Sequence, residues 1–304
     1  MTLPRVSFAT LPRVLFVTGK GGTGKSTVAA ALALARSRRR PTTLADLDRR
    51  LSAAAMLGVT AVDGTAAKVT KSLEVIALGA RAELDAFIAR IVPVRAISRR
   101  MLRSRTFGYV TAALPGLEAF LLLERLRIMA GDAALEDRYL VIDAPASGSA
   151  LELLSVAAGV KNISPTGTLN RLADSVAAFL ADPTRFGAII TVTPEELALR
   201  EALETEANMR ERLSITTVAA IMNRVPDSLF DTAELAALSP LGDHARLAVR
   251  RNSANEVASA MAQRLAKAGI ATIDLPMMFT PTMGINELEQ LGDVLAAELQ
   301  ESLK

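Results

Sequence analysis

The chain has 304 residues, of which half are hydrophobic and only 4% aromatic, and its formal net charge is +3. So small a net charge indicates no strong attraction to nucleic acid. The sequence contains no cysteine and a single histidine, His244, which excludes disulfides, thiolate metal sites, cysteine nucleophiles and histidine clusters. No uncharged stretch reaches ~18 residues, and no long apolar segment precedes Arg13, so we expect a cytoplasmic protein without a spanning helix or secretory signal.

Short apolar segments alternate with helical patterns along most of the chain. The predicted strands are Val14–Thr18, Thr43–Ala45, Leu73–Leu78, Tyr139–Ile142, Ala188–Val192, Thr216–Met222 and Ala271–Asp274. This alternation is typical of an α/β fold with a doubly wound, mostly parallel sheet flanked by helices. The stretch from Gly79 to about Glu136 lacks a convincing strand, and helical patterns broken near Pro93 and at Pro115-Gly116 predict a helical insertion there. We expect one domain over residues 1–304 that carries this insertion.

A glycine-rich segment joins the first predicted strand to the first helix. Its sequence is Gly19-Lys20-Gly21-Gly22-Thr23-Gly24-Lys25-Ser26-Thr27. Strand, glycine-rich turn and helix form the setting of a phosphate-binding loop, in which backbone N–H groups and the positive helix end face the phosphates. Lys25 would add a full charge at the β- and γ-phosphates, Ser26 would ligate Mg²⁺, and Thr27 could reach the α-phosphate. Alternatively, the segment is a plain turn between a strand and a helix, but such a turn does not require this spacing of glycines or both lysines.

Carboxylates end two of the other predicted strands. Tyr139-Leu140-Val141-Ile142-Asp143 is an apolar strand that ends in Asp, at the edge of a parallel sheet where such folds bind ligands. Asp143 is therefore a candidate Mg²⁺ ligand, acting through water, or else a cap for the next turn. Asp46 and Asp48 follow the strand after the loop helix, and they could instead be solvated acids that balance Arg49 and Arg50.

With Lys20 after its first glycine, the loop has the form K-G-G-x-G-K-[S/T] and resembles the deviant Walker A class of P-loop ATPases. Three further segments resemble the ArsA and tail-anchored-protein targeting branch of that class: residues 114–118, 143–154 and 191–197. The resemblance implies an ATP-dependent homodimer, or a heterodimer with a related ATPase subunit, in which Lys20 reaches the partner's nucleotide. Alternatively, Lys20 stays in solvent or on its own subunit's phosphates. The last segment also predicts a capping box, with Thr193 as N-cap, Pro194 at N1 and Glu196 at N3.

The resemblance also implies roles for single residues. Asp48 would orient the attacking water, which makes it a catalytic residue beside Lys20 and Lys25, and Asp46 would support the magnesium shell. Asn223 would hydrogen-bond adenine, or alternatively start the turn toward Pro226. The implied cofactors are ATP or ADP and Mg²⁺.

The chain departs from the family pattern at both switch segments. Ser149 stands where switch II usually has His, and Arg49 where switch I usually has Pro. The missing cysteines exclude thiolate arsenite binding and a zinc-clamped dimer, so the chain resembles the cysteine-free bacterial relatives more closely.

Three functions are compatible with these observations. The leading hypothesis is an ATPase whose nucleotide-driven dimer closure controls binding of an unknown protein client or membrane partner. The second is a weakly hydrolysing regulatory subunit, suggested by Arg49 and Ser149. The third, a MinD- or ParA-like positioning ATPase, is disfavoured because the final helix, Asn286 to Lys304, has an acidic polar face. The leucine stripe of that helix predicts packing on the sheet, and Met277, Met278 and Met283 before it are expected in the core.

Overall fold

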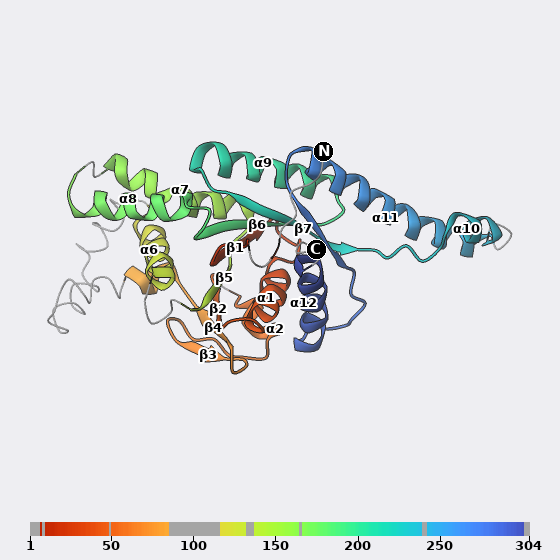
Figure 1. Ribbon diagram of the computed structural model, residues 1–304, viewed down its shortest axis with the longest axis horizontal. Coiled ribbons are helices and arrows are strands. Elements are labelled where there is room, and N and C mark those ends of the chain that lie inside the picture. The colour runs from red at the N-terminus through yellow and green to blue at the C-terminus, as the bar shows by residue number, and fades with distance from the viewer. Residues whose placement is uncertain are drawn as a thin grey trace.

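An eight-stranded sheet runs through the protein, with the strand order β3-β4-β2-β5-β1-β6-β7-β8 (Figure 1). The computed structural model describes residues 7, 10–48, 50–84, 116–131, 137–163, 166–238 and 242–300. The strands are β1 (Val14–Gly19), β2 (Thr42–Asp46), β3 (Ala66–Lys68), β4 (Leu73–Ala77), β5 (Tyr139–Asp143), β6 (Phe186–Val192), β7 (Thr217–Val225) and β8 (Thr272–Pro276). Neighbouring strands pair in parallel except β3, which is antiparallel to β4.

Helices cover both faces of this sheet. The described helices are α1 (Lys25–Ser37), α2 (Ser52–Met56), α6 (Leu117–Gly131), α7 (Ser147–Ile163), α8 (Thr168–Ala181), α9 (Glu196–Leu213), α10 (Thr232–Leu238), α11 (Asp243–Lys267) and α12 (Ile285–Gln300). One face carries α1, α2 and α12, and the other carries α6, α7, α8, α9 and α11 (Figure 1). The predicted α/β fold with a mostly parallel sheet is confirmed.

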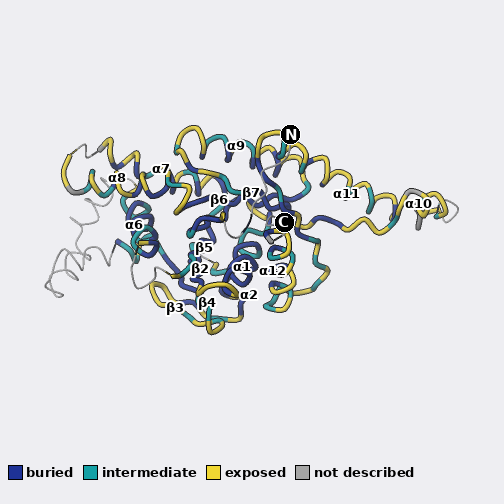
Figure 2. Tube along the Cα trace, in the orientation of Figure 1, coloured by how far each residue is buried: buried dark blue, intermediate teal, exposed yellow. Residues whose placement is uncertain are grey.

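The core follows the two-residue period of the strands. In β1, Leu15 and Val17 pack with α1 and α12, whereas Val14 and Phe16 pack with the helices of the opposite face. All six residues of β1 are buried, as expected for a central parallel strand that is covered on both sides. Figure 2 shows this burial along the central strands.

All seven predicted strands are present, with ends that differ by only a few residues. The prediction missed β3, a three-residue edge strand with the sequence Ala-Ala-Lys, because it has no apolar alternation to signal a strand. The leucine stripe of α12 is buried as expected, and it packs against α1 and β8. Gly292 permits this close approach, since an added Cβ would lie 3.1 Å from the Ala31 carbonyl oxygen of α1.

The predicted capping box at α9 is wrong. The helix begins at Glu196, its N-cap is Glu195, and no side chain caps it. Strand β6 continues to Val192 and a tight turn follows, in which the Glu195 N–H donates to the Thr193 carbonyl, so the helix starts later than the pattern suggests. The Glu196 carboxylate pairs instead with Arg264 of α11, at 2.5 and 2.9 Å.

The predicted helical insertion lies largely outside the described residues, which exclude 85–115 and 132–136. The expected break near Pro93 falls in that part. Within the described part, α6 is helical as predicted and follows Gly116, whose φ is +83°. No helix among the described residues is long and apolar enough to cross a membrane.

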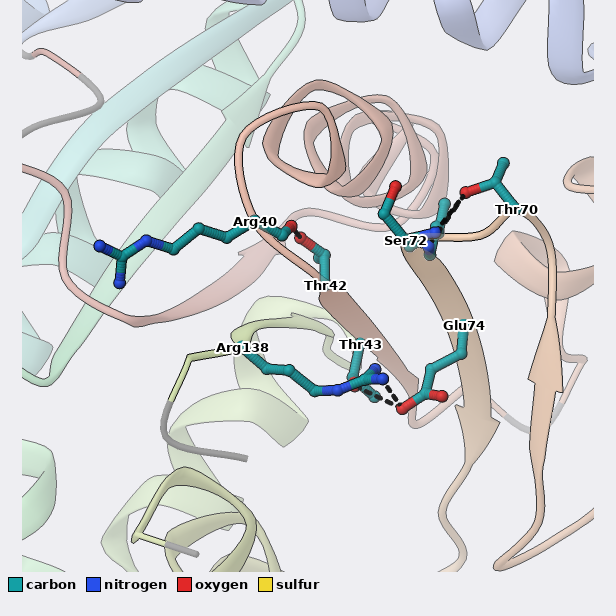
Figure 3. A network of polar contacts seen from close by, with 8 residues as sticks. Arg40, Thr42, Thr43, Thr70, Ser72, Glu74 and Arg138 are labelled. Carbon is teal, nitrogen blue, oxygen red and sulfur yellow. Dashed lines mark hydrogen bonds and ion pairs between the residues drawn. The ribbon is translucent and has the colours of Figure 1, made fainter. Parts of the chain in front are cut away.

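Polar contacts join β2, β4 and β5 at their amino ends, away from the glycine-rich loop (Figure 3). Glu74 of β4 accepts a hydrogen bond from Thr43 Oγ1 at 2.9 Å and pairs with Arg138 at 2.7 Å. Thr42 Oγ1 donates to the Arg40 carbonyl at 3.0 Å. These contacts fix the register of strands whose opposite ends carry the candidate site.

Candidate nucleotide-binding site

The loop between β1 and α1 has a conformation that only glycine tolerates at two points. Gly19 has φ +152° and Gly24 has φ +89°, and an added Cβ would clash with the Thr191 carbonyl or with Asn223 Nδ2, respectively. Gly24 is the N-cap of α1, and no side chain caps this helix. The first-turn N–H groups of α1 are therefore available to an anion, as in a phosphate-binding loop.

The Lys20 carbonyl organises the loop from within. It accepts hydrogen bonds from the Thr23 N–H at 3.3 Å, from Thr23 Oγ1 at 2.9 Å and from Lys25 Nζ at 3.5 Å. The Lys25 ammonium thus folds over the loop, where it can meet a bound phosphate. The Lys20 ammonium forms no ion pair with a carboxylate in the part of the chain that the structure describes.

Buried threonines tie the loop to the neighbouring strands. Thr23 Oγ1 and Thr191 Oγ1 are 2.8 Å apart, and Thr191 Oγ1 is also 3.1 Å from the Thr18 carbonyl oxygen. Thr18 Oγ1 donates to the Pro145 carbonyl at 2.9 Å, which connects β1 to the turn after β5. Neither Thr18 nor Thr191 was predicted from the sequence to hold the loop, although a threonine at a buried strand end is the signal that could have indicated it.

Asp143 lies at the end of β5 and is fully buried, and neither of its carboxylate oxygens has a hydrogen-bond partner among the described residues. Burial raises the pKa of Asp143 to about 7. The nearby Ser26 hydroxyl and Lys25 ammonium oppose this shift in pKa, although Ser26 does not complete a hydrogen bond of ordinary geometry. A buried carboxylate without a partner, beside a hydroxyl and an ammonium, fits a bound divalent cation.

Asp46 lies directly opposite Asp143 in the register of β2 and β5. Its Oδ1 accepts the Asp48 N–H at 3.0 Å and its Oδ2 accepts the Ala54 N–H at 3.2 Å. Burial raises the pKa of Asp46, and these backbone hydrogen bonds oppose that rise. The alternative of a solvated acid is therefore wrong for Asp46, which is buried and shapes the turn before α2.

Asp48 follows at the same edge of the sheet and is partly exposed. Its Oδ1 accepts the Arg50 N–H and its Oδ2 accepts the Ser52 hydroxyl, both at 3.2 Å. Its negative charge reaches Asp143, whose pKa it helps to raise. Arg49, the other candidate counter-charge, lies outside the described residues.

Asn223 belongs to β7, which continues to Val225, so the alternative that it starts a turn is wrong. The side chain is buried against the loop, where Nδ2 donates to the Thr23 carbonyl at 2.9 Å and Oδ1 accepts the Arg224 N–H at 3.0 Å. A cavity of about 80 Å³ opens beside it. Its lining residues are Thr27, Asn223, Arg224, Pro276, Met277, Met278, Met283 and Leu291.

The expectation that Met277, Met278 and Met283 lie in the core is therefore only partly met. Met278 and Met283 pack against the core around α1, as predicted, but they also face the cavity. Met277 lines the same cavity and is 38% exposed. Thioethers are soft and adaptable, which suits contact with a flat ring.

The structure thus brings Lys25, Ser26, Asp46, Asp48 and Asp143 to one edge of the sheet, with Asn223 beside the loop. Ser149 is exposed on α7 and joins none of these contacts. The described residues contain no group of three carboxylates or histidines that could hold a metal by themselves. Mg²⁺ at this site would therefore depend on water and phosphate ligands as well, which is its usual preference.

Comparison with known proteins agrees with this geometry. The sequence profile of the family described as anion-transporting ATPase matches residues 12–166, just over half of the chain, and this range holds the loop and all three aspartates. The chain belongs to the anion-transporting ATPase family. This membership confirms the resemblance to ArsA and accounts for the P-loop fold of the sheet.

Proteins similar in sequence to this chain occur in mycobacteria. The ATPase BagA of Mycobacterium tuberculosis and a putative ATPase of Mycobacterium bovis are each 26% identical to the chain over 222 residues. The aligned region covers 70% of this chain and 65% of each relative, so the chain spans less than two thirds of the relatives' length.

We predict that Asp143→Asn stabilises the metal-free protein most strongly at alkaline pH. The folded-state pKa of about 7 exceeds the ordinary value of 3.8, so burial of the charged form costs stability fully above pH 7 and less as the pH falls toward 3.8. The shift corresponds to an upper bound of roughly 4 kcal/mol.

Denaturant unfolding in a chelating buffer at pH 8 and pH 5 measures this difference. The gain in unfolding free energy should shrink between pH 8 and pH 5, whereas Glu289→Gln, at an exposed position of α12, should have little effect at either pH. An Asp143→Asn gain that is absent, or equal at both pH values, would contradict the prediction.

Proposed function

We propose that this protein is a magnesium-dependent ATPase that binds MgATP at the loop between β1 and α1. The observation that carries the proposal is the buried Asp143 carboxylate, which has no described partner and lies beside Lys25 and Ser26. Membership of the anion-transporting ATPase family, and relatives named as ATPases, support the same activity.

The loop residues would bind the triphosphate of ATP. Backbone N–H groups of Gly21, Gly22 and Gly24 and the first turn of α1 would face the phosphate oxygens, and Lys25 would neutralise charge on the β- and γ-phosphates. Ser26, Asp46 and Asp143 would hold Mg²⁺, which when bound supplies further positive charge to the phosphates. Thr27 would reach the α-phosphate from the next position of α1.

Hydrolysis requires a water molecule in line with the γ-phosphorus atom. Asp48 would accept a hydrogen bond from this water and so orient it for attack, after which the bond to the β-phosphate oxygen breaks and ADP and phosphate form. The contacts of Asp48 with the Arg50 N–H and the Ser52 hydroxyl fix the direction of its carboxylate. Each of its oxygens keeps a second lone pair for the water.

The base of the nucleotide would occupy the cavity beside Asn223. The carboxamide uses one donor hydrogen and one acceptor lone pair for contacts within the protein. One hydrogen and one lone pair remain, which matches the donor and acceptor that adenine offers at its edge.

We further propose that two subunits close around ATP, in a homodimer or in a heterodimer with a related ATPase subunit. Lys20 would then contact the nucleotide of the partner, a role that its ammonium can take because it has no carboxylate partner among the described residues. Closure would control binding of a protein client or membrane partner in the cytoplasm, with no role for nucleic acid. The absence of cysteine excludes thiolate binding of arsenite by this chain.

A second candidate is a nucleotide-binding regulatory subunit with little turnover. The observation that favours it is that both Asp48 oxygens already hold the turn before α2. Ser149, which stands where switch II usually has histidine, also favours a subunit with little turnover.

We predict that Lys25→Ala weakens MgATP binding roughly a hundredfold or more, because no other side chain of the loop supplies that charge at the phosphates. Calorimetric titration measures the affinity, with Lys71→Ala, at an exposed position before β4, as the control. Equal affinity of Lys25→Ala and wild type would refute the phosphate-binding loop.

Asp48→Asn should leave MgATP binding nearly unchanged and slow turnover by roughly 10²- to 10⁴-fold, since an amide is a poor acceptor for the proton of the attacking water. Phosphate release and nucleotide affinity are measured on the same preparations. An active wild type with an equally active Asp48→Asn protein would show that the assignment is wrong. If neither protein turns over, the regulatory candidate gains support.

Lys20→Ala should bind ADP nearly normally but fail to associate in ATP, because this charge acts on a phosphate of the other subunit and counts most when closure excludes water. Sedimentation with ADP and with a non-hydrolysable ATP analogue compares the mutant with wild type, in the presence of any paired subunit from the native cell. Equal ATP-dependent association in both proteins would make Lys20 a local loop residue.

A further inference from the structure

Strand β7 contains an irregularity directly beside the loop. Met222 pairs with Asp274 and Val225 pairs with Pro276, so Asn223 and Arg224 together lie opposite Leu275 alone. An extra residue of this kind is a β-bulge, which breaks the alternation of a strand and redirects its side chains, often next to a functional site. The bulge determines how both residues meet the cavity.

Arg224 has a strained backbone at this bulge. Its φ is +60°, in the left-handed region that residues other than glycine and asparagine rarely adopt. The conformation is held by Asn223, whose Oδ1 accepts the Arg224 N–H at 3.0 Å. Strained residues of this kind concentrate at ligand sites, where the surrounding structure enforces them.

The Arg224 side chain is exposed and lines the cavity. Among the described residues its guanidinium has no hydrogen bond and no ion pair. The neighbouring acid Asp227 is paired with Arg251 of α11, at 3.8 Å, and Arg251 in turn stacks over the ring of Phe279. Arg224 is therefore a cation at the edge of the cavity, and none of the described side chains pairs with it.

The remaining walls of the cavity suit a flat ring. Pro276, Met277 and Met278 supply apolar and thioether surface, while Thr27 and Asn223 bring polar atoms next to the phosphate-binding loop. A planar guanidinium stacks well on aromatic faces, and thioethers also contact aromatic rings favourably.

We propose that Arg224 is a positioning residue that stacks on the purine ring of the bound nucleotide. The inference rests on the nucleotide site proposed above and adds a specific contact to it. Because the base takes no part in the reaction, this contact is equally strong in the ground state and in the transition state. Its loss should raise KM and leave kcat unchanged.

Calorimetric titration with MgATP and ADP tests the proposal, with inorganic tripolyphosphate as a competitor that lacks a base. Arg224→Ala should weaken both nucleotides by roughly fivefold to thirtyfold and leave tripolyphosphate binding unchanged. Arg224→Gly should show the same loss of affinity although it relieves the strained φ, and Arg224→Lys should recover part of it. Arg250→Ala, at an exposed position of α11, is the control and should match wild type.

Three results would overturn the inference. Wild-type nucleotide affinity in Arg224→Ala would remove the stacking role. An equal loss of tripolyphosphate binding would show that the guanidinium acts on phosphates instead of the base. A kcat that falls while KM stays constant would exclude a ground-state contact. Failure of the wild type itself to bind MgATP would refute the proposed function, which is a separate outcome.

Discussion

The buried charge of Asp143 is the constraint around which this edge of the sheet is arranged. A carboxylate without a hydrogen-bond partner in a protein interior is costly unless a cation compensates it. The strand order puts β5 between β2 and β1, so that Asp143 lies across from Asp46 on one side and from Val17, just before the glycine-rich loop, on the other. Two carboxylates that can bind a cation therefore lie next to a lysine-bearing loop that can bind an anion.

The loop facing this charge is held by contacts from several strands. Thr191 of β6 and Asn223 of β7 both contact Thr23, and Thr18 of β1 contacts the turn after β5. A ligand that moves the loop must therefore move the ends of β6 and β7, or break these hydrogen bonds. This coupling offers a physical route from nucleotide binding to α9, which follows β6, and through the Thr18 contact to α7, which follows β5.

Much of this arrangement can be predicted from the sequence, because the residue patterns that indicate it are local. The strands are continuous apolar runs, and the loop depends on glycines whose spacing fixes the positions of Lys25 and Ser26. Other features depend on tertiary contacts. The bulge at Asn223 and Arg224 arises from pairing with β8, and the engagement of Asp46 by two backbone N–H groups arises from the turn before α2. The α9 capping box failed for a similar reason, because a tight turn after Val192 delays the start of the helix to Glu196, and Arg264 takes the Glu196 carboxylate.

In the function proposed here, the loop and the buried aspartate form a single site for a nucleotide and its magnesium ion. Titration of the wild-type chain with ATP, in saturating Mg²⁺ and in excess chelator, measures this most directly. We expect binding of about one nucleotide per chain in Mg²⁺ and a large loss of affinity in chelator, because the charge of Asp143 then opposes the phosphates. No binding in Mg²⁺, or an affinity that chelator leaves unchanged, would contradict it.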